Sequence, residues 1–282
     1  MNEQAKKLIE LVNKRNVEKN TKFIAVSSGK GGVGKTTFAV NFAYHLSNTF
    51  NKKVLLIDAD MGMADIHTIL NIKPTNNIKN LINGKKLEDI VVSKFNIDIL
   101  PGFSGIESID DLDGILISKI INDLAEFSAK YDYLIIDTSA GIDNKVSAFI
   151  RASNRSYIIT TPEPTAYLDA YALIKSIYKV YYYSNFKLII NMCKNKNEAL
   201  EVYDRLKASF NKFLNKDFEF YGWIPFSKTV NKAIKEQKLV AHSYPSDPFS
   251  QYIKNLAAKE VGEKVEDIKP NFWERLINLI KG

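Results

Sequence analysis

The sequence contains one cysteine, Cys193, in 282 residues. A single thiol excludes an intramolecular disulfide framework and any metal site built from a pair of cysteines. No apolar run approaches the ~18 residues that a transmembrane helix needs, and the first residues lack the apolar segment of a signal peptide. We therefore expect a cytoplasmic chain, and a composition of 45% hydrophobic and 25% charged residues is typical of a globular protein.

The charge of the chain is positive but is not concentrated in one place. The formal net charge is +7, and no run of five or six like charges occurs. A basic balance permits acidic partners such as phospholipid headgroups or nucleic acid. A solvated basic surface accounts for it equally well, so the charge alone selects no partner.

The strongest motif is the stretch SGKGGVGKTT at residues 28–37. It fits the phosphate-loop pattern Gly-x4-Gly-Lys-Ser/Thr and lies between an apolar strand pattern and an amphipathic helical pattern. Glycines let the backbone wrap around phosphates, and the helix N-terminus adds the positive end of its dipole. We expect Lys35 to reach the β- and γ-phosphates and Thr36 to ligate Mg²⁺. The predicted nucleotide site comprises Gly29, Lys30, Gly31, Gly32, Val33, Gly34, Lys35, Thr36 and Thr37.

Strand and helix patterns alternate along the rest of the chain. Continuous apolar runs suit strands that are buried on both faces of a parallel sheet. The alternation predicts an α/β fold with a single doubly wound, mostly parallel sheet, spanning one domain at residues 22–265 and binding ligands at the C-terminal ends of its strands. The predicted strands are Phe23–Ser27, Lys53–Asp58, Ile97–Leu100, Tyr133–Asp137, Ser156–Thr161, Lys187–Asn191 and Phe218–Trp223. The predicted helices are Thr36–Leu46, Ile115–Lys130, Thr165–Tyr181 and Ala199–Phe213.

Three acidic residues end or follow apolar strands at the predicted ligand edge. Asp137 is placed to hold Mg²⁺ directly or through water. Asp58 and Asp60 leave the second strand on the same side of an extended chain. One of them can support the water shell of the metal and the other can orient an attacking water; alternatively, one caps a helix at Met63–Leu70. Phosphoryl transfer to water rests on positioning and charge, so no covalent nucleophile is needed.

Lys30 is a second lysine in the loop, at a position where most phosphate loops accept any residue. It adds positive charge near the γ-phosphate, where charge develops during hydrolysis. The loop is too crowded for Lys30 to serve its own nucleotide as Lys35 does. We expect Lys30 to reach the nucleotide of a neighbouring subunit, which would make each site a shared one.

These residues resemble the MinD/ParA group of deviant-Walker-A ATPases, a group of P-loop NTPases, over most of residues 22–256. The resemblance implies an ATP-driven homodimer with slow and partner-regulated Mg²⁺-dependent ATP hydrolysis. It implies catalytic roles for Lys30, Lys35 and Asp60 and metal-binding roles for Thr36, Asp58 and Asp137. It also implies an adenine pocket at Asn191 and Pro225. The family usually has an acid where Ser227 stands. The strings that carry the resemblance are KGGVGKT from Lys30, DAD from Asp58, DTSAGI from Asp137, TPEPT from Thr161 and LDAY from Leu168.

Residues 2–14 predict an amphipathic helix ahead of the core, within an N-terminal segment at 1–21. The string NEQAKKL from Asn2 resembles the Asp-Gln-Ala-x-x-Leu motif of the FlhG (FleN) family, the flagellar-number ATPases, with Glu3 in place of the usual Asp. In that family the helix stimulates the partner GTPase FlhF, an SRP-type GTPase. The resemblance implies partner-binding roles for Gln4 and Leu8; the alternative is that this helix packs on its own domain.

Residues 271–281 form a second amphipathic pattern, within a C-terminal segment at 266–282. Pro270 precedes it, where a helix can begin, and aromatic residues lie at the boundary between its apolar and polar sides. This is the pattern of an interfacial helix that binds anionic lipids, and pairing through dimerisation would strengthen the binding. The alternative is that it docks in a groove of its own domain. The predicted membrane-binding residues are Phe272, Trp273, Leu276, Ile277 and Ile280.

Three functions remain open at this point. The two end helices favour a membrane-associating regulatory ATPase of the FlhG type, which would act with FlhF, and with flagellar switch proteins or a transcriptional regulator, on the cytoplasmic face of the inner membrane near a cell pole. A division-site ATPase of the MinD type shares the fold but lacks the N-terminal helix. A DNA-partition ATPase of the ParA type would suit the net charge, but the aromatic C-terminal helix argues against DNA as a partner.

Overall fold

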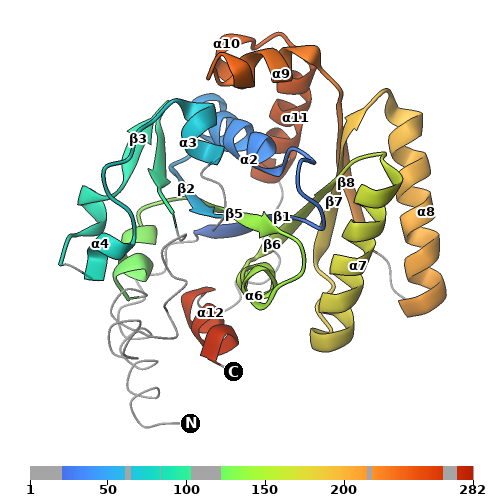
Figure 1. The fold of residues 1–282 in the computed structure, drawn as a ribbon, viewed down its shortest axis with the longest axis horizontal. Coiled ribbons are helices and arrows are strands. Elements are labelled where there is room, and N and C mark those ends of the chain that lie inside the picture. Colours follow the sequence, from blue (N-terminus) through green and yellow to red (C-terminus); the bar gives the residue numbers. More distant parts are fainter. Residues whose placement is uncertain are drawn as a thin grey trace.

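The computed structural model describes residues 21–60, 65–82, 84–102, 122–214, 218–262 and 272–281. Within these ranges the core is an eight-stranded sheet in the order β3-β4-β2-β5-β1-β6-β7-β8. Helices cover both faces of this twisted sheet (Figure 1). The predicted doubly wound, mostly parallel α/β fold is confirmed, since every strand pair is parallel except β3 with β4.

β1 lies in the middle of the sheet and carries the phosphate loop at its C-terminal end. Its neighbours are β5 on one side and β6 on the other. The chain therefore leaves β1 at the topological switch point, where α/β sheets bind ligands. The strands are β1 (Lys22–Ser28), β2 (Val54–Ala59), β3 (Val92–Lys94), β4 (Ile97–Leu100), β5 (Tyr133–Ala140), β6 (Arg155–Thr160), β7 (Phe186–Cys193) and β8 (Glu219–Pro225).

The helices form two layers. In Figure 1, α2, α3 and α9 to α11 lie above the central strands, and α6, α7 and α12 lie below them. The bounds are α2 (Lys35–Tyr44) continued by a π-helical turn (His45–Thr49), α3 (Asp65–Leu70), α4 (Lys79–Ile82), a short 3₁₀ turn (Leu87–Asp89), α6 (Asn144–Ala152), α7 (Pro164–Tyr181), α8 (Lys196–Leu214), α9 (Lys228–Lys235), α10 (Val240–Ser243), α11 (Pro248–Gly262) and α12 (Phe272–Lys281).

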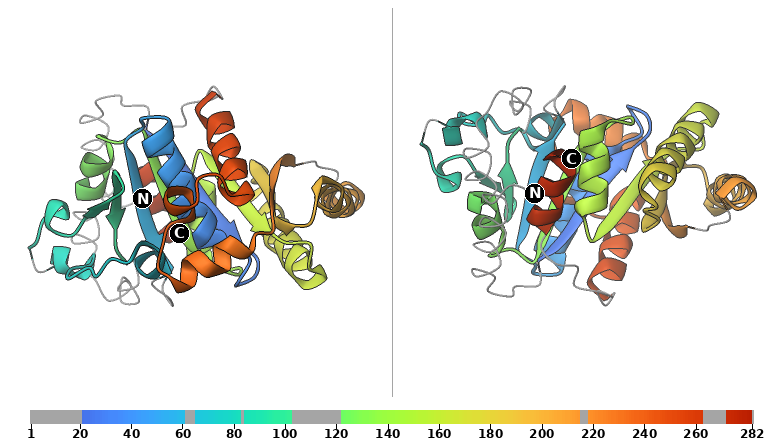
Figure 2. Two further views of the ribbon diagram at one scale, coloured as in Figure 1. Left: turned by 90° about the horizontal axis from the view of Figure 1, so that it is seen from above. Right: turned by 90° about the horizontal axis from the view of Figure 1, so that it is seen from below.

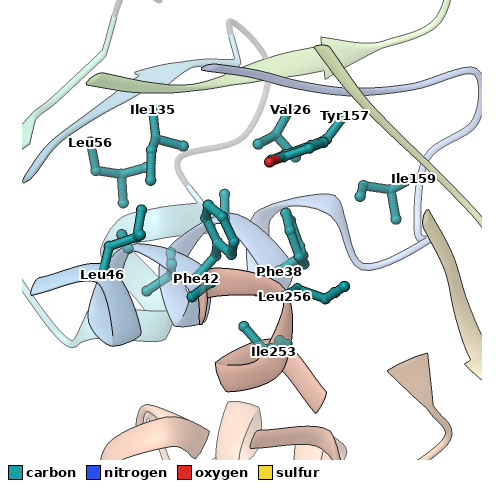
Figure 3. Packing of buried hydrophobic residues seen from close by; sticks show 14 of the residues in the cluster. Val26, Phe38, Phe42, Leu46, Leu56, Ile135, Tyr157, Ile159, Ile253 and Leu256 are labelled. Carbon is teal, nitrogen blue, oxygen red and sulfur yellow. The ribbon is translucent and has the colours of Figure 1, made fainter. Parts of the chain in front are cut away.

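The helix after the phosphate loop, α2, is buried on all sides. Phe38 and Phe42 face the sheet and meet Tyr157 of β6 edge to face, with ring centroids 6.1 and 5.7 Å away. Ile253 and Leu256 of α11 belong to the same buried cluster, and Figure 3 shows them on the side of α2 away from the sheet. Close packing of this kind resists even small displacements, so the loop that begins α2 has a rigid base.

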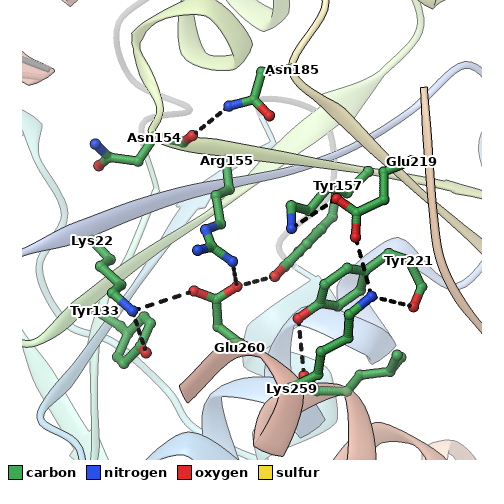
Figure 4. Close-up of polar contacts among 12 residues, drawn as sticks. Lys22, Tyr133, Asn154, Arg155, Tyr157, Asn185, Glu219, Tyr221, Lys259 and Glu260 are labelled. Atoms are coloured by element: carbon green, nitrogen blue, oxygen red, sulfur yellow. Dashed lines mark hydrogen bonds and ion pairs between the residues drawn. The ribbon is translucent and has the colours of Figure 1, made fainter. Parts of the chain in front are cut away.

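A buried polar network joins α11 to the first residues of the central strands β1 and β6 (Figure 4). The Glu260 side chain is fully buried and accepts a hydrogen bond from Arg155 Nη1 at 2.9 Å and another from the Tyr157 hydroxyl. Lys22 Nζ lies 3.9 Å from the other carboxylate oxygen of Glu260. The charged partners offset the cost of burying the carboxylate, and the network joins α11 to β1 and β6.

The C-terminal helix α12 docks on its own domain, which was the alternative to the membrane role. Phe272 stacks on Phe23 of β1 with ring centroids 4.2 Å apart, and Trp273 Nε1 donates to Ser128 Oγ at 3.0 Å. Phe272, Trp273 and Leu276 are at most 3% exposed. Seen from below, α12 lies beside α6 (Figure 2, right). The apolar face of α12 therefore replaces part of the helical layer that covers this side of the sheet.

Several predictions fall outside the described residues. These are the helix at 2–14 with Gln4 and Leu8, the side chains of Ile277 and Ile280, and the first part of the helix predicted at Ile115–Lys130, of which residues 122–128 are described and helical. The described helices include none that is long and apolar enough to span a bilayer.

The sequence patterns missed β3 and the helices α6 and α9 to α11. β3 has three residues and turns into β4 through Phe95 and Asn96, both of which have positive φ. This turn lacks the Asn-Gly or Asp-Gly signal of a tight hairpin. α6 and α9 each begin at a side-chain cap, in which Asp143 accepts from Val146 N and Ser227 accepts from Thr229 N. Asp and Ser are favoured N-cap residues, so the sequence contained the information to predict the starts of these two helices.

Candidate nucleotide site

The phosphate loop connects β1 to α2 at the C-terminal edge of the sheet, as predicted. Lys35 begins α2, and its Nζ lies 2.7 Å from Oδ1 of Asp137, which belongs to β5. Both side chains are buried, with exposed fractions of 7% and 1%. The Thr36 hydroxyl also faces the Asp137 carboxylate and helps to lower its pKa. The structure thus brings together the loop lysine, the loop threonine and the acid that the sequence predicted as metal ligand.

Asp58 and Asp137 are register partners on the neighbouring strands β2 and β5. Burial and the adjacent Asp137 carboxylate raise the pKa of Asp58 to about 7. Burial also raises the pKa of Asp137, and the ion pair with Lys35 opposes that shift. Asp58 Oδ1 accepts from the backbone N–H of Asp60 at 3.2 Å, whereas its buried Oδ2 has no protein partner.

This donor set fits a magnesium ion. Carboxylate and hydroxyl oxygens are the ligands that Mg²⁺ prefers, usually together with water and phosphate oxygens. Two buried carboxylates at adjacent register positions repel each other, and a divalent cation near them would reverse the resulting pKa shifts. The unpartnered Oδ2 of Asp58 is an acceptor that a metal-bound water can fill. Thr36, Asp58 and Asp137 can therefore support a nucleotide-bound metal.

Two loop glycines are required for different structural reasons. A Cβ on Gly29 would lie 2.2 Å from the backbone carbonyl carbon of Asp169, so α7 packs directly against the loop at this point. Gly34 has φ +86°, and a Cβ there would lie 2.5 Å from Asn191 Nδ2. Gly34 thus combines the left-handed conformation that favours glycine with a close approach to β7. The packing role of Gly29 was not apparent from the motif.

Lys30 points to the N-terminus of α7. Its Nζ lies 2.9 Å from Glu163 Oε1 and 2.6 Å from Thr165 Oγ1, and this contact is exposed to solvent. The positive charge of Lys30 lowers the pKa of Glu163. Glu163 and Thr165 belong to the TPEPT string that resembled the family, but the sequence assigned them no role. Lys30 thus contacts residues of its own chain in this structure, and its reach to a second nucleotide stays a prediction.

Pro225 ends β8, and Asn191 lies two residues before the end of the neighbouring β7, where it contacts the loop. Asn191 is buried and donates from Nδ2 to the Val33 carbonyl at 2.9 Å, and Pro225 is the register partner of Cys193. Their contacts with an adenine base stay a prediction. Ser227, which replaces the acid usual in the family, caps α9 and donates to Asp247 Oδ2 at 2.9 Å. A carboxylate is thus present beside Ser227, supplied by Asp247.

Comparison with known proteins places this site in a family. A sequence profile described as an AAA domain matches residues 21–190. The antiactivator FleN of Pseudomonas aeruginosa is 33% identical over 245 residues, covering 86% of this chain and 85% of FleN. The flagellum site-determining protein YlxH of Helicobacter pylori is 35% identical over 266 residues, covering 91% of this chain and 90% of YlxH.

A solved structure is similar to this chain in fold. The MinC:MinD cell division protein complex of Aquifex aeolicus matches with a TM-score of 0.67 and 26% identity, covering 88% of this chain and 98% of that chain. At this coverage the match extends well beyond the phosphate loop. With its loop lysines, strand-end acids and strand order, the chain belongs to the MinD/ParA-type P-loop ATPase family.

Proposed function

We propose that this protein is a membrane-associating regulatory ATPase that controls the number or placement of flagella. The observation that carries the proposal is the joint likeness to FleN and YlxH over at least 85% of each chain, together with a complete set of phosphate-loop, metal-supporting and strand-end residues. The name of FleN describes an antiactivator and that of YlxH a flagellum site-determining protein. Both names describe regulators. In a regulator, slow ATP hydrolysis would set how long the protein stays in its ATP-bound state.

ATP with Mg²⁺ is the proposed ligand. The backbone of the loop and the N-terminus of α2 would hold the phosphates, and Lys35 would exchange its contact with Asp137 for the β- and γ-phosphates. The metal would neutralise charge on the transferred phosphoryl group. Asp60 follows β2 directly, next to Asp58, and would orient the attacking water. The proposal is supported by the position of these residues, which lie at or beside the C-terminal ends of the central strands.

The active form is proposed to be a homodimer that forms when ATP is bound. Lys30 would leave Glu163 and Thr165 and reach the nucleotide of the second subunit, adding positive charge where it develops. Two apolar side chains near the loop, Ile142 and Leu168, are 52% and 56% exposed and would be covered in such a dimer. The exposed, easily broken contact of Lys30 suits a residue that changes partners.

Dimerisation would control two outputs at the ends of the chain. Residues 2–14, through Gln4 and Leu8, would stimulate an SRP-type GTPase of the FlhF kind. The α12 helix would leave its groove and bind anionic lipids of the inner membrane, reversibly and near a cell pole. Flagellar switch proteins or a transcriptional regulator would receive the signal, and DNA is not a proposed partner. A division-site role is the second candidate, supported by the likeness to MinD.

The deciding experiment separates these candidates by their partners. A peptide of residues 1–20 should raise GTP turnover by FlhF, and a Gln4→Ala peptide should not. Unchanged GTP turnover with both peptides would exclude the flagellar-GTPase role. In size-exclusion chromatography with Mg-ATP, Asp60→Ala should form a dimer that retains ATP, whereas Lys30→Ala and Lys35→Ala should stay monomeric. A Lys30→Ala variant that dimerises normally would contradict the role of Lys30 across the interface.

A further inference from the structure

The C-terminal end of α7 exposes apolar and aromatic side chains in a row. Val180, Tyr181 and Tyr182 are 61%, 37% and 81% exposed, and the neighbouring Lys179 is also exposed. We call Lys179, Val180, Tyr181 and Tyr182 the α7-end patch. Single exposed apolar residues are normal, but a contiguous apolar and aromatic patch marks an interaction surface. This patch lies far from the phosphate loop, since twelve helical residues, or ~18 Å, separate Asp169 from Tyr181.

The backbone presents Tyr182 to solvent at a position that favours glycine. Tyr182 has φ 56° and ψ 20°, the left-handed conformation, and its N–H donates to the Tyr178 carbonyl to end α7. Glycine is the usual residue at this point of a helix because side chains are strained there. The ring gains little packing in return, since it is the most exposed of the large hydrophobic side chains in the described ranges. Its placement therefore suits a contact outside the subunit.

The charges around the α7-end patch are positive. Arg151, at the end of α6, places its guanidinium 3.5 Å from the ring centroid of Tyr181, and Lys175 and Lys179 are the charged residues on the last three turns of α7. Tyrosines with apolar neighbours and basic residues are the composition that binds the headgroup region of a membrane. Lysine and arginine near such a surface are attracted to anionic lipids.

We propose that the α7-end patch is a second membrane contact of this protein, which places Tyr181 and Tyr182 among anionic lipid headgroups. The inference rests on the membrane association proposed above and adds a site separate from α12. The two sites adjoin: burial raises the pKa of the Tyr183 hydroxyl to about 12, and Arg275 of α12 lies close enough to Tyr183 to oppose that rise. Figure 1 shows the end of α7 and helix α12 both at the lower end of the molecule.

The two contacts would act at different stages. While α12 is docked, its aromatic side chains are buried and cannot meet lipid. The α7-end patch is exposed in that same state. It would therefore give a weak, salt-sensitive attraction to anionic membranes without ATP, and the release of α12 would add a stronger contact.

Flotation with lipid vesicles tests this proposal on the full chain. Vesicles of phosphatidylcholine with and without phosphatidylglycerol would be mixed with the protein at low salt, without nucleotide and with Mg-ATP. The Val180→Ser/Tyr182→Gly double variant should bind phosphatidylglycerol vesicles at least fivefold more weakly than the wild type without nucleotide. Tyr182→Gly also removes the backbone strain, so the variant should fold normally by circular dichroism. Phe226→Ser is the matched control, because Phe226 is 53% exposed and follows the C-terminal end of β8, whereas α7 ends shortly before the N-terminal end of β7.

The outcomes separate this inference from the proposed function. Trp273→Glu should keep its nucleotide-free binding within twofold of wild type and lose the increase with ATP. If the double variant binds like the wild type while Trp273→Glu loses all binding, α12 is the membrane contact and this inference is wrong. If the wild type binds no vesicle in either state, both proposals fail. If the double variant binds vesicles normally but fails to restore flagellar number in cells, the patch serves a protein partner and this inference is overturned.

Discussion

The contact between the phosphate loop and α7 gives the sharpest prediction, because Gly29 and Gly31 are only two positions apart but differ in what an added methyl group would meet. A Cβ on Gly29 would lie 2.2 to 2.6 Å from backbone atoms of Asp169 and Ala170, whereas a Cβ on Gly31 would meet nothing within 4 Å. Ordinary contacts begin near 3.4 Å. Gly29→Ala therefore requires α7 to move by roughly 1 Å, and backbone atoms cannot move aside like a flexible side chain.

The expected cost of Gly29→Ala is about 3 kcal/mol of unfolding free energy, at the upper end of overpacking effects. Gly31→Ala should leave the stability unchanged or raise it by up to about 1 kcal/mol, because alanine restricts the unfolded chain. Gly32→Ala is an intermediate case, since φ is +78° but the space is open; its strain should cost about 1–2 kcal/mol. Gly29→Ala should therefore lose the most stability, because of a steric clash. Gly32→Ala should lose less, because of backbone strain, and Gly31→Ala should lose none.

Equilibrium urea unfolding without nucleotide, followed by circular dichroism, measures these differences. The urea midpoint should fall strongly for Gly29→Ala and stay near wild type for Gly31→Ala. The slope of the unfolding free energy against urea concentration should be the same for both variants. Nucleotide is left out because binding would add stability of its own. Equal midpoints for Gly29→Ala and Gly31→Ala would refute the packing of α7 against the loop.

Three further predictions concern the core and the docked helix. Phe272→Ala should lower the unfolding free energy by about 3 kcal/mol, because it removes the ring that stacks on Phe23; an unchanged urea midpoint would mean that α12 is detached in solution. Glu260→Gln should cost about 3 kcal/mol, because it removes the buried negative charge that pairs with Arg155 Nη1, and a variant as stable as wild type would contradict the buried network. Burial lowers the pKa of His45 to about 4, below its unfolded value. Protons thus bind the unfolded state more tightly, and stability should fall by about 2 kcal/mol from about pH 7.5 to about pH 5, a loss that a His45→Gln variant should not show.

The sequence predicted the parts of the fold that depend on local pattern. Apolar runs ending in Asp58 and Asp137 indicated buried parallel strands, and the loop motif located the nucleotide site. The register that makes these two acids neighbours depends on which strands pair, and no local pattern contains that information. The same limit applies to Glu163 and Thr165, whose contacts with Lys30 join residues more than 130 positions apart.

The C-terminal helix shows a different limit of sequence patterns. An apolar face with Phe272 and Trp273 fits a membrane surface and a protein groove equally well, because both offer an escape from water. The structure has this face in the groove beside α6. Only the relative free energies of the two environments decide between them, and the bound nucleotide is expected to change that difference.

Helix α7 has contacts with very different parts of the molecule along one uninterrupted element. Its first turn receives Lys30 of the loop, its second packs on Gly29, and its last presents Tyr181. An α-helix of 18 residues spans ~27 Å and does not shorten when pushed. Any rearrangement of the loop that moves the beginning of α7 must therefore move its other end as well, so α7 joins the phosphate loop mechanically to the opposite side of the subunit.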